Sequence, residues 1–176
     1  MIQQIVDSDG NDINSCLDYT IMMSNGSELG MTRDPNGSGL LADESPPNGG
    51  AIIEFSITTP KPESGKTWTS GVLGYIRGAY YEGGGIIQQY LYTFKPGNIT
   101  HVGWTTSSGR ATRFRAVKID GNRVSLSAEI SGTASVVKGI RLNKSKNQFE
   151  VDDSALKLNM ACQFVKVETL HGFIQP

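Results

Sequence analysis

The segment Arg-Val-Ser-Leu-Ser-Ala-Glu-Ile, residues 123–130, alternates polar and apolar side chains without a break. The segment Leu-Lys-Leu-Asn-Met-Ala-Cys-Gln-Phe, residues 156–164, repeats that alternation. A period of two places apolar side chains on one face of a pleated strand and polar side chains on the other. Both segments are therefore predicted strands, and together they favour an all-β chain.

Turn signals next to these segments predict how the strands connect. Asp120-Gly121-Asn122 separates residues 110–120 from residues 123–130, and an Asp-Gly turn between alternating segments is typical of a β-hairpin. Ser154 could instead cap a helix over the start of residues 156–164, but the strict alternation favours a strand. We expect an antiparallel β-sandwich or a jelly-roll-like domain, and no internal repeat is apparent.

The first fifty residues differ in character from the rest of the chain. Residues 1–24 predict a short N-terminal hairpin, whereas residues 25–50 contain many Gly, Pro and Asn residues and little apolar periodicity. A loop of that length is uncommon inside a compact domain. We therefore expect a hairpin and extended arm over residues 1–50 and a main β-sandwich over residues 51–176.

Composition excludes several functional classes. The 176 residues include 16 basic and 17 acidic side chains, so the net charge of −1 provides no basic field for nucleic acid or an anionic membrane. No apolar stretch is long enough to span a bilayer, and no signal peptide is visible at the N-terminus. Only 38% of residues are hydrophobic, which suggests either a largely solvated sandwich or a subunit that buries surface against copies of itself.

Reactive or metal-binding groups do not form a recognisable set. Asp7, Asp9 and Asp12 around Gly10 resemble the start of a calcium loop, but a hairpin turn requires the same residue types. Cys16 and Cys162 could pair or remain thiols, and the alternation predicts a buried Cys162 thiol. We expect a protein without cofactor, metal or enzymatic activity. A β-sandwich hydrolase using paired carboxylates is a less favoured alternative.

Aromatic residues are concentrated between positions 68 and 104. Flat aromatic faces beside guanidinium and amide donors are typical of sugar recognition. The adjacent tyrosines at 80 and 81 must point to opposite faces of a strand, so one of them could be exposed. The alternative is that these rings are core or cross-strand pairs. The predicted glycan-binding residues are Trp68, Arg77, Tyr80, Tyr81 and Trp104.

Three short motifs carry a resemblance to a known family. They are Gly-Val-Leu-Gly-Tyr-Ile-Arg at 71–77, Gly-Gly-Ile-Ile-Gln-Gln-Tyr-Leu-Tyr at 84–92 and Gly-Trp-Thr-Thr at 103–106. Over residues 71–115 the chain resembles the knob modules of bacteriophage tail fibres. That resemblance implies a non-enzymatic virion protein, located in the phage particle, that forms homotrimers, contacts other virion proteins and attaches to a host surface glycan. A free carbohydrate-binding β-sandwich module is the alternative.

Overall fold

The computed structural model describes residues 2–35, 37, 39–130, 136–152 and 160–168, without the side chains of residues 81, 82, 152 and 160. In these residues nearly all regular structure is antiparallel β-sheet, which confirms the all-β prediction. A single 3₁₀ turn, η1 at Ser108–Arg110, follows the seventh strand. Across the described ranges, no helix is long and apolar enough to cross a bilayer.

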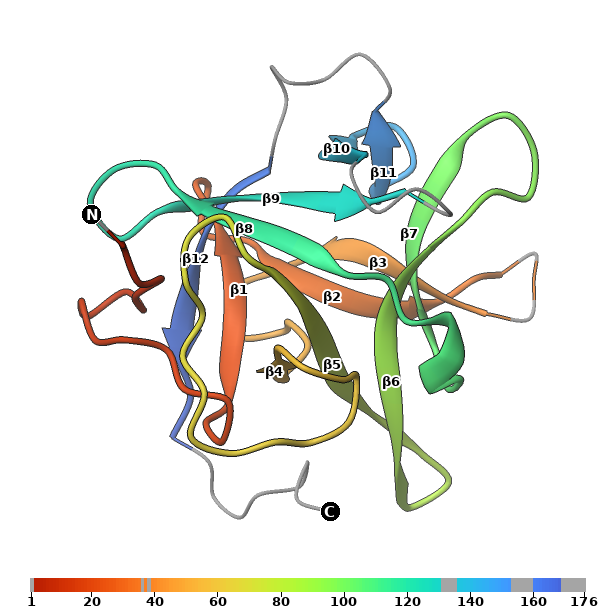
Figure 1. The fold of residues 1–176 in the computed structure, drawn as a ribbon. Coiled ribbons are helices and arrows are strands. Elements are labelled where there is room, and N and C mark those ends of the chain that lie inside the picture. The colour runs from red at the N-terminus through yellow and green to blue at the C-terminus, as the bar shows by residue number, and fades with distance from the viewer. Residues whose placement is uncertain (1, 36, 38, 131–135, 153–159, 169–176) are drawn as a thin grey trace.

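Six of the twelve strands in the described chain close into a barrel (Figure 1). Each strand pairs with the next around the ring, and the last pairs with the first. A closed ring leaves no unpaired edge in the barrel wall. In ring order the barrel strands are β1 (Tyr19–Met23), β4 (Ile53–Ser56), β5 (Leu73–Glu82), β8 (Phe114–Lys118), β9 (Val124–Glu129) and β12 (Met160–Lys166).

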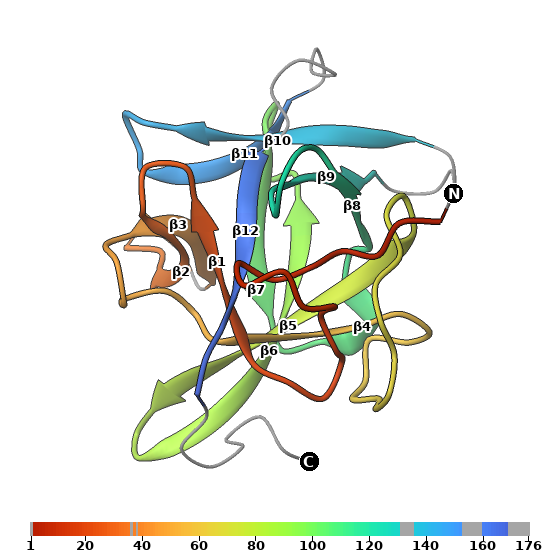
Figure 2. The same ribbon diagram turned by 90° about the vertical axis from the view of Figure 1, so that its left-hand side faces the viewer.

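The other six strands form three hairpins that meet at one end of the barrel. One strand of each hairpin, β3, β7 or β11, pairs with the other two in a triangle. Figure 2 shows β10 and β11 lying across this end, with β12 running down the barrel. The hairpin strands are β2 (Glu28–Arg33) and β3 (Leu40–Ser45), β6 (Gly85–Phe94) and β7 (Thr100–Thr105), and β10 (Val137–Asn143) and β11 (Gln148–Asp152).

The pairings repeat three times along the chain. Strands β1–β4, β5–β8 and β9–β12 each contribute two barrel strands and one cap hairpin, which is the arrangement of a β-trefoil. The twelve strands of the described chain therefore form one connected sheet closed by its own hairpins. The expected two-layer sandwich or jelly roll is replaced by this closed barrel.

The β8–β9 hairpin shows how local sequence specifies the barrel wall. Phe114 pairs with Ala128, and Ala116 pairs with Leu126, so all four side chains face the core. Gly121 has a φ of 49°, a left-handed conformation that glycine adopts without strain. The hairpin predicted from residues 110–130 is thus present, with its apolar face inward.

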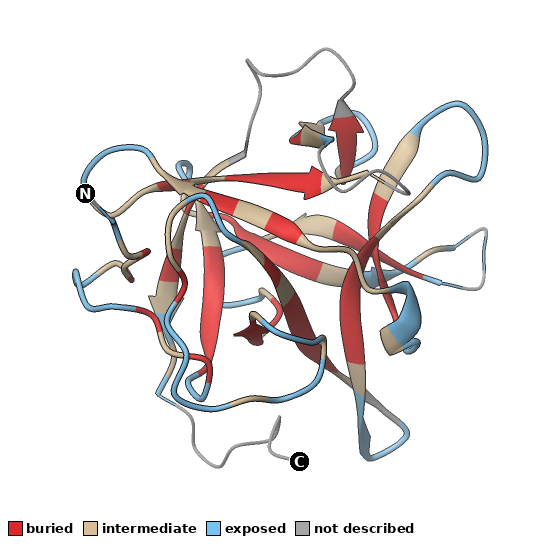
Figure 3. Cartoon of the chain, in the orientation of Figure 1, coloured by how far each residue is buried: buried red, intermediate tan, exposed pale blue. Residues whose placement is uncertain are grey.

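Burial is concentrated on the strands, and exposure on the connecting loops (Figure 3). The core cluster combines residues from all three repeats, including Ile21, Ile76 and Leu126. Because the barrel closes on itself, the inward faces of its strands are buried within one chain. A hydrophobic content of 38% therefore does not require burial against further copies.

The structure places residues 1–50 in the same sheet and core as the later residues. Ile5, Ile13 and Tyr19 are fully buried in the shared core, and β1 pairs with both β4 and β12. Residues 25–50, expected to be an extended arm, contain β2 and β3. The prediction failed here because the polar residues of these short strands, such as Asp43 and Glu44, interrupt the apolar alternation.

Candidate functional site

Trp68, one of the predicted glycan-binding residues, belongs to the core. Its ring is fully buried and packs against Phe55 and Phe164, with ring centroids 5.4 and 6.0 Å away. Its indole Nε1–H donates a hydrogen bond of 2.8 Å to the Val72 carbonyl oxygen. The ring is therefore packed inside the protein and its N–H is already hydrogen-bonded, so Trp68 has no exposed face on which a sugar could bind.

Arg77 is also buried, as a charge inside the barrel wall. Its guanidinium Nη2 donates to Glu54 Oε2, whereas its Nε and Nη1 have no partner within the described part of the chain. Burial raises the pKa of the Glu54 carboxyl, and the nearby Arg77 charge opposes that increase. Arg77 therefore serves as the partner of a buried carboxylate and offers nothing to an external ligand.

Two of the three remaining predicted residues line a cleft beside the cap. Tyr80 and Trp104 line it, although Trp104 is only 2% exposed and donates through Nε1 to the Gly30 carbonyl oxygen at 3.1 Å. Tyr81 lies in β5 and pairs with Ile86, and its side chain is outside the described part of the structure. Trp68 and Arg77 therefore belong to the core, whereas Tyr80 and Trp104 line this cleft, so these four residues do not form one patch.

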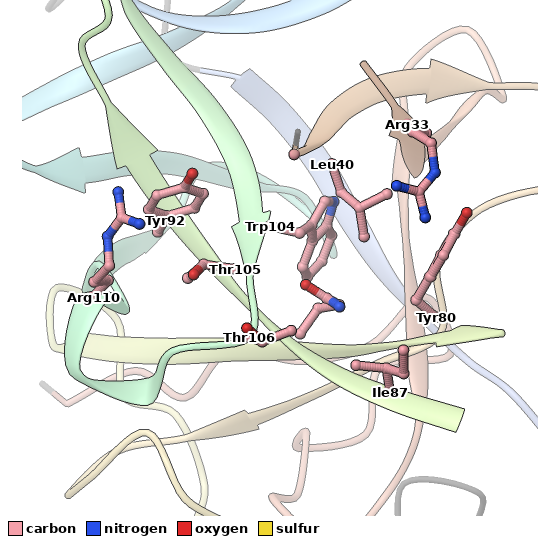
Figure 4. Close-up of a pocket in the computed structure, with 11 residues that line it drawn as sticks. Arg33, Leu40, Tyr80, Ile87, Tyr92, Trp104, Thr105, Thr106 and Arg110 are labelled. Carbon is pink, nitrogen blue, oxygen red and sulfur yellow. The ribbon is translucent and has the colours of Figure 1, made fainter. Parts of the chain in front are cut away.

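Two arginines complete the cleft, which has a volume of about 360 Å³ (Figure 4). Arg33 lies at the end of β2 and Arg110 in η1, so the two come from different repeats. We call this site the arginine cleft, lined by Arg33, Tyr80, Gln89, Tyr92, Trp104 and Arg110 among others. Sequence reasoning missed both arginines because only the closure of β3 against β7 brings their segments together.

A second surface feature is the long connection between β4 and β5. Its first part, residues 57–67, is mostly exposed, with Ile57, Pro60 and Glu63 half-buried (Figure 3). The Glu63 carboxylate accepts hydrogen bonds from the backbone N–H groups of Ile57 and Thr58, which ties the loop across its base. Ser56 Oγ also donates to the Thr59 carbonyl oxygen at 2.6 Å. We call residues 57–67 the braced loop.

Two lysines project from the braced loop, and they differ in how their backbone groups are hydrogen-bonded. The Lys66 N–H donates to Ser15 Oγ at 3.1 Å, and the Lys66 carbonyl accepts from the Ser15 N–H at 2.9 Å. The Lys61 N–H makes only a long contact of 3.4 Å to Thr59 Oγ1. Lys61 therefore has the more accessible backbone as well as an exposed side chain.

The acidic turn is closed by its own side chain, and the two cysteines do not pair. Asp7 Oδ1 accepts hydrogen bonds from the N–H groups of Asp9 and Asn11, so this carboxylate closes its own turn. No cluster of three or more potential metal ligands is found in the described ranges. Cys16 and Cys162 are free thiols. Burial raises the pKa of Cys162 to about 12, so this thiol stays protonated and unreactive.

Neither a protein-family model nor a curated protein sequence matches this chain. Solved structures match it along nearly its whole length. Trypsin inhibitor 1 from Senna obtusifolia has a TM-score of 0.70 at 13% identity, over 95% of this chain and 100% of that one. The water-soluble chlorophyll protein from Brassica oleracea, with chlorophyll b, has a TM-score of 0.68 at 16% identity, over 94% and 99%. The double-headed arrowhead protease inhibitor A, in complex with two trypsins, has a TM-score of 0.67 at 15% identity, over 93% and 99%.

These likenesses establish the fold and correct the functional prediction. The resemblance to phage tail-fibre knobs over residues 71–115 is wrong, because that segment corresponds to strands β5–β8, one repeat of a fold shared with plant inhibitors and chlorophyll proteins. The predicted virion role, trimeric state, virion partners and host glycan are wrong with it. The carbohydrate-binding alternative is also wrong, since Trp68, Arg77 and Trp104 are buried. The neighbours are protease inhibitors and pigment-binding proteins, not enzymes.

Proposed function

We propose that this protein is a non-enzymatic inhibitor of trypsin-like serine proteases and that it acts through Lys61 of the braced loop. The observation that carries the proposal is an exposed lysine on a loop braced by Glu63. Trypsin binds a basic side chain in a pocket with an aspartate at its base. Several neighbours that share this fold are trypsin inhibitors.

The loop geometry supports binding with little loss of conformational entropy. Pro62 fixes its own φ and disfavours helical backbone at Lys61, so the lysine is restrained to the extended conformation that a protease cleft accepts. A loop already held in its bound shape avoids much of the ordering cost of association. Pro62 also makes the bond after Lys61 a tertiary amide, and we expect trypsin to cut that bond slowly.

Inhibition kinetics test the proposal. The full chain is titrated against trypsin with a chromogenic lysyl substrate, and we expect dose-dependent inhibition with the protein recovered intact by mass spectrometry. Lys61→Ala should raise the inhibition constant at least about 30-fold, the loss of one dominant contact, whereas Lys61→Arg should retain inhibition. Lys66→Ala removes the same charge from the same loop and should leave inhibition unchanged. The proposal fails if the protein does not inhibit at tens of micromolar, if it is cut rapidly after Lys61, or if Lys61→Ala inhibits like the parent.

A further inference from the structure

A second pocket lies in the cap, where the three hairpins meet. Its volume of about 410 Å³ falls in the range of small-molecule sites. It shares no lining residue with the arginine cleft or the braced loop, and we call it the cap pocket. Each hairpin contributes to its wall: Asp34 and Leu41 come from the β2–β3 hairpin, Phe94, Pro96 and His101 from the β6–β7 hairpin, and Lys146 and Gln148 from the β10–β11 hairpin.

The walls of the cap pocket are held together by hydrogen bonds between the hairpins. Leu41, His101 and Gln148 lie on β3, β7 and β11, the three strands that pair with one another in the cap triangle. Asn147 Nδ2 donates to the Glu44 carbonyl oxygen at 2.9 Å, which ties the β10–β11 turn to the end of β3. A ligand therefore meets a pocket that is already formed, and binding needs little ordering of the chain.

One side of the cap pocket is aromatic and apolar. Phe94 and His101 are a cross-strand pair, with ring centroids 5.5 Å apart and ring planes 31° from parallel. The Tyr92 ring stacks on Phe94 at 5.1 Å and 16° and helps to fix its orientation. Phe94 and His101 are only half-buried, so they offer a flat surface against which a planar ligand can stack.

The polar groups of the cap pocket are mostly donors without a partner. The exposed Lys146 ammonium and the Gln148 amide form no hydrogen bond or ion pair with described residues. His101 Nδ1 is enclosed by the protein and also lacks a partner, so the imidazole can meet a ligand only through Nε2 or its ring face. Asp34, the one acid that lines the pocket in the described chain, already has an interaction of its own.

We propose that the cap pocket binds a small aromatic monoanion, a flat ring that bears one carboxylate. The ring stacks against Phe94 and His101. The carboxylate accepts charge-assisted hydrogen bonds from the Lys146 ammonium and further bonds from the Gln148 amide. A second carboxylate on the ligand would meet the Asp34 charge, so the pocket selects a monoanion over a dianion.

Isothermal titration calorimetry with three probes of similar shape tests this assignment. The probes are 2-naphthoate, the neutral 2-naphthalenemethanol and naphthalene-2,6-dicarboxylate. We expect 2-naphthoate to bind about tenfold more tightly than the neutral alcohol, because only the anion gains the charge-assisted contact, and more tightly than the dicarboxylate. Lys146→Gln should weaken 2-naphthoate by about tenfold and leave the neutral probe unchanged, whereas Phe94→Leu should weaken both probes.

A matched control lies two residues away in the same turn. Lys144 is exposed like Lys146 but does not line the cap pocket, so Lys144→Gln should bind 2-naphthoate like the parent. Arg110→Gln should also bind it normally, which shows that the probe does not occupy the arginine cleft. Since both lysines are exposed, their substitutions should preserve the fold, which near-UV circular dichroism verifies.

The cap pocket and the proposed inhibition are independent. Lys146→Gln should inhibit trypsin like the parent, and Lys61→Ala should bind 2-naphthoate like the parent. The inference is refuted if the neutral probe or the dicarboxylate binds as tightly as 2-naphthoate, if Lys144→Gln weakens binding as much as Lys146→Gln, or if no binding is detected at millimolar concentration.

Discussion

Substituting Gly103 by alanine should destabilise the protein by blocking the contact between two cap hairpins. Gly103 in β7 pairs with Leu41 in β3, at one side of the triangle that closes the cap. A Cβ added at Gly103 would lie 2.7 Å from the Leu40 carbonyl oxygen and 2.8 Å from Phe94 Cε1. Contacts under 3.0 Å require movement, and the Leu40 carbonyl is strand backbone that cannot rotate aside as a side chain can.

Two opposing effects set the magnitude. Alanine in place of glycine at an unstrained site stabilises by about 0.4–1 kcal/mol, because the unfolded chain loses conformational freedom. Overpacking a close contact costs about 1–3 kcal/mol, and the immobile carbonyl places this site in the upper part of that range. The net expectation is that Gly103→Ala lowers the free energy of unfolding by about 1–2.5 kcal/mol, which at this chain length lowers Tm by about 3–8 °C.

Urea denaturation and thermal unfolding measure the effect against a matched control in the same hairpin. Gly97 lies in the β6–β7 turn, where an added Cβ meets nothing within 4 Å. Gly97→Ala should leave stability unchanged or raise it by up to about 1 kcal/mol. If Gly103→Ala is as stable as Gly97→Ala, the β3–β7 approach is not as close as described, and the reasoning about cap closure is refuted.

Three further predictions concern the core and its charges. Glu54→Gln leaves the Arg77 cation buried without its carboxylate and should lower the free energy of unfolding by about 3–5 kcal/mol. Glu129→Gln, in the partly exposed pair with Arg113, should lower it by under about 1 kcal/mol. Equal losses of stability in urea denaturation would contradict this prediction. Burial raises the pKa of Asp43 above its ordinary value of 3.8, so the native state binds more protons than the unfolded state and stability falls as pH rises from 3.8 through the folded pKa. Asp43→Asn should therefore be more stable than the parent at neutral pH, and the difference in free energy of unfolding between the two should decrease towards about pH 3.5. A difference that does not change with pH would exclude the raised pKa of Asp43 as its cause. Trp68→Ala should destabilise by about 3–5 kcal/mol through the cavity it leaves, and a loss under about 1 kcal/mol would show that the ring is not part of the core.

The alternating residues predicted the individual strands because burial of one strand face leaves a local pattern. Val124, Leu126 and Ala128 face the core as their spacing requires, and the Asp120-Gly121 turn connects the two strands as expected. The same reasoning failed for residues 25–50, where the strands are short and partly polar. The prediction that Trp68 and Trp104 bind a ligand failed for a different reason. A period of two separates the two faces of a strand, but it does not say which face becomes the interior of a barrel.

Local composition was sufficient for strand content, for the β8–β9 hairpin and for the burial of the Cys162 thiol. Only the tertiary structure determined the closure of the barrel, the triangle of cap hairpins and the threefold repeat. Each of these depends on pairing between strands that are far apart in sequence. The arginine cleft depends on the same closure: Arg33 and Arg110 belong to different repeats, and the pairing of β3 with β7 places them around one cleft. Periodicity records which side of a strand is apolar, whereas a site assembled from several strands requires distances that no single segment encodes.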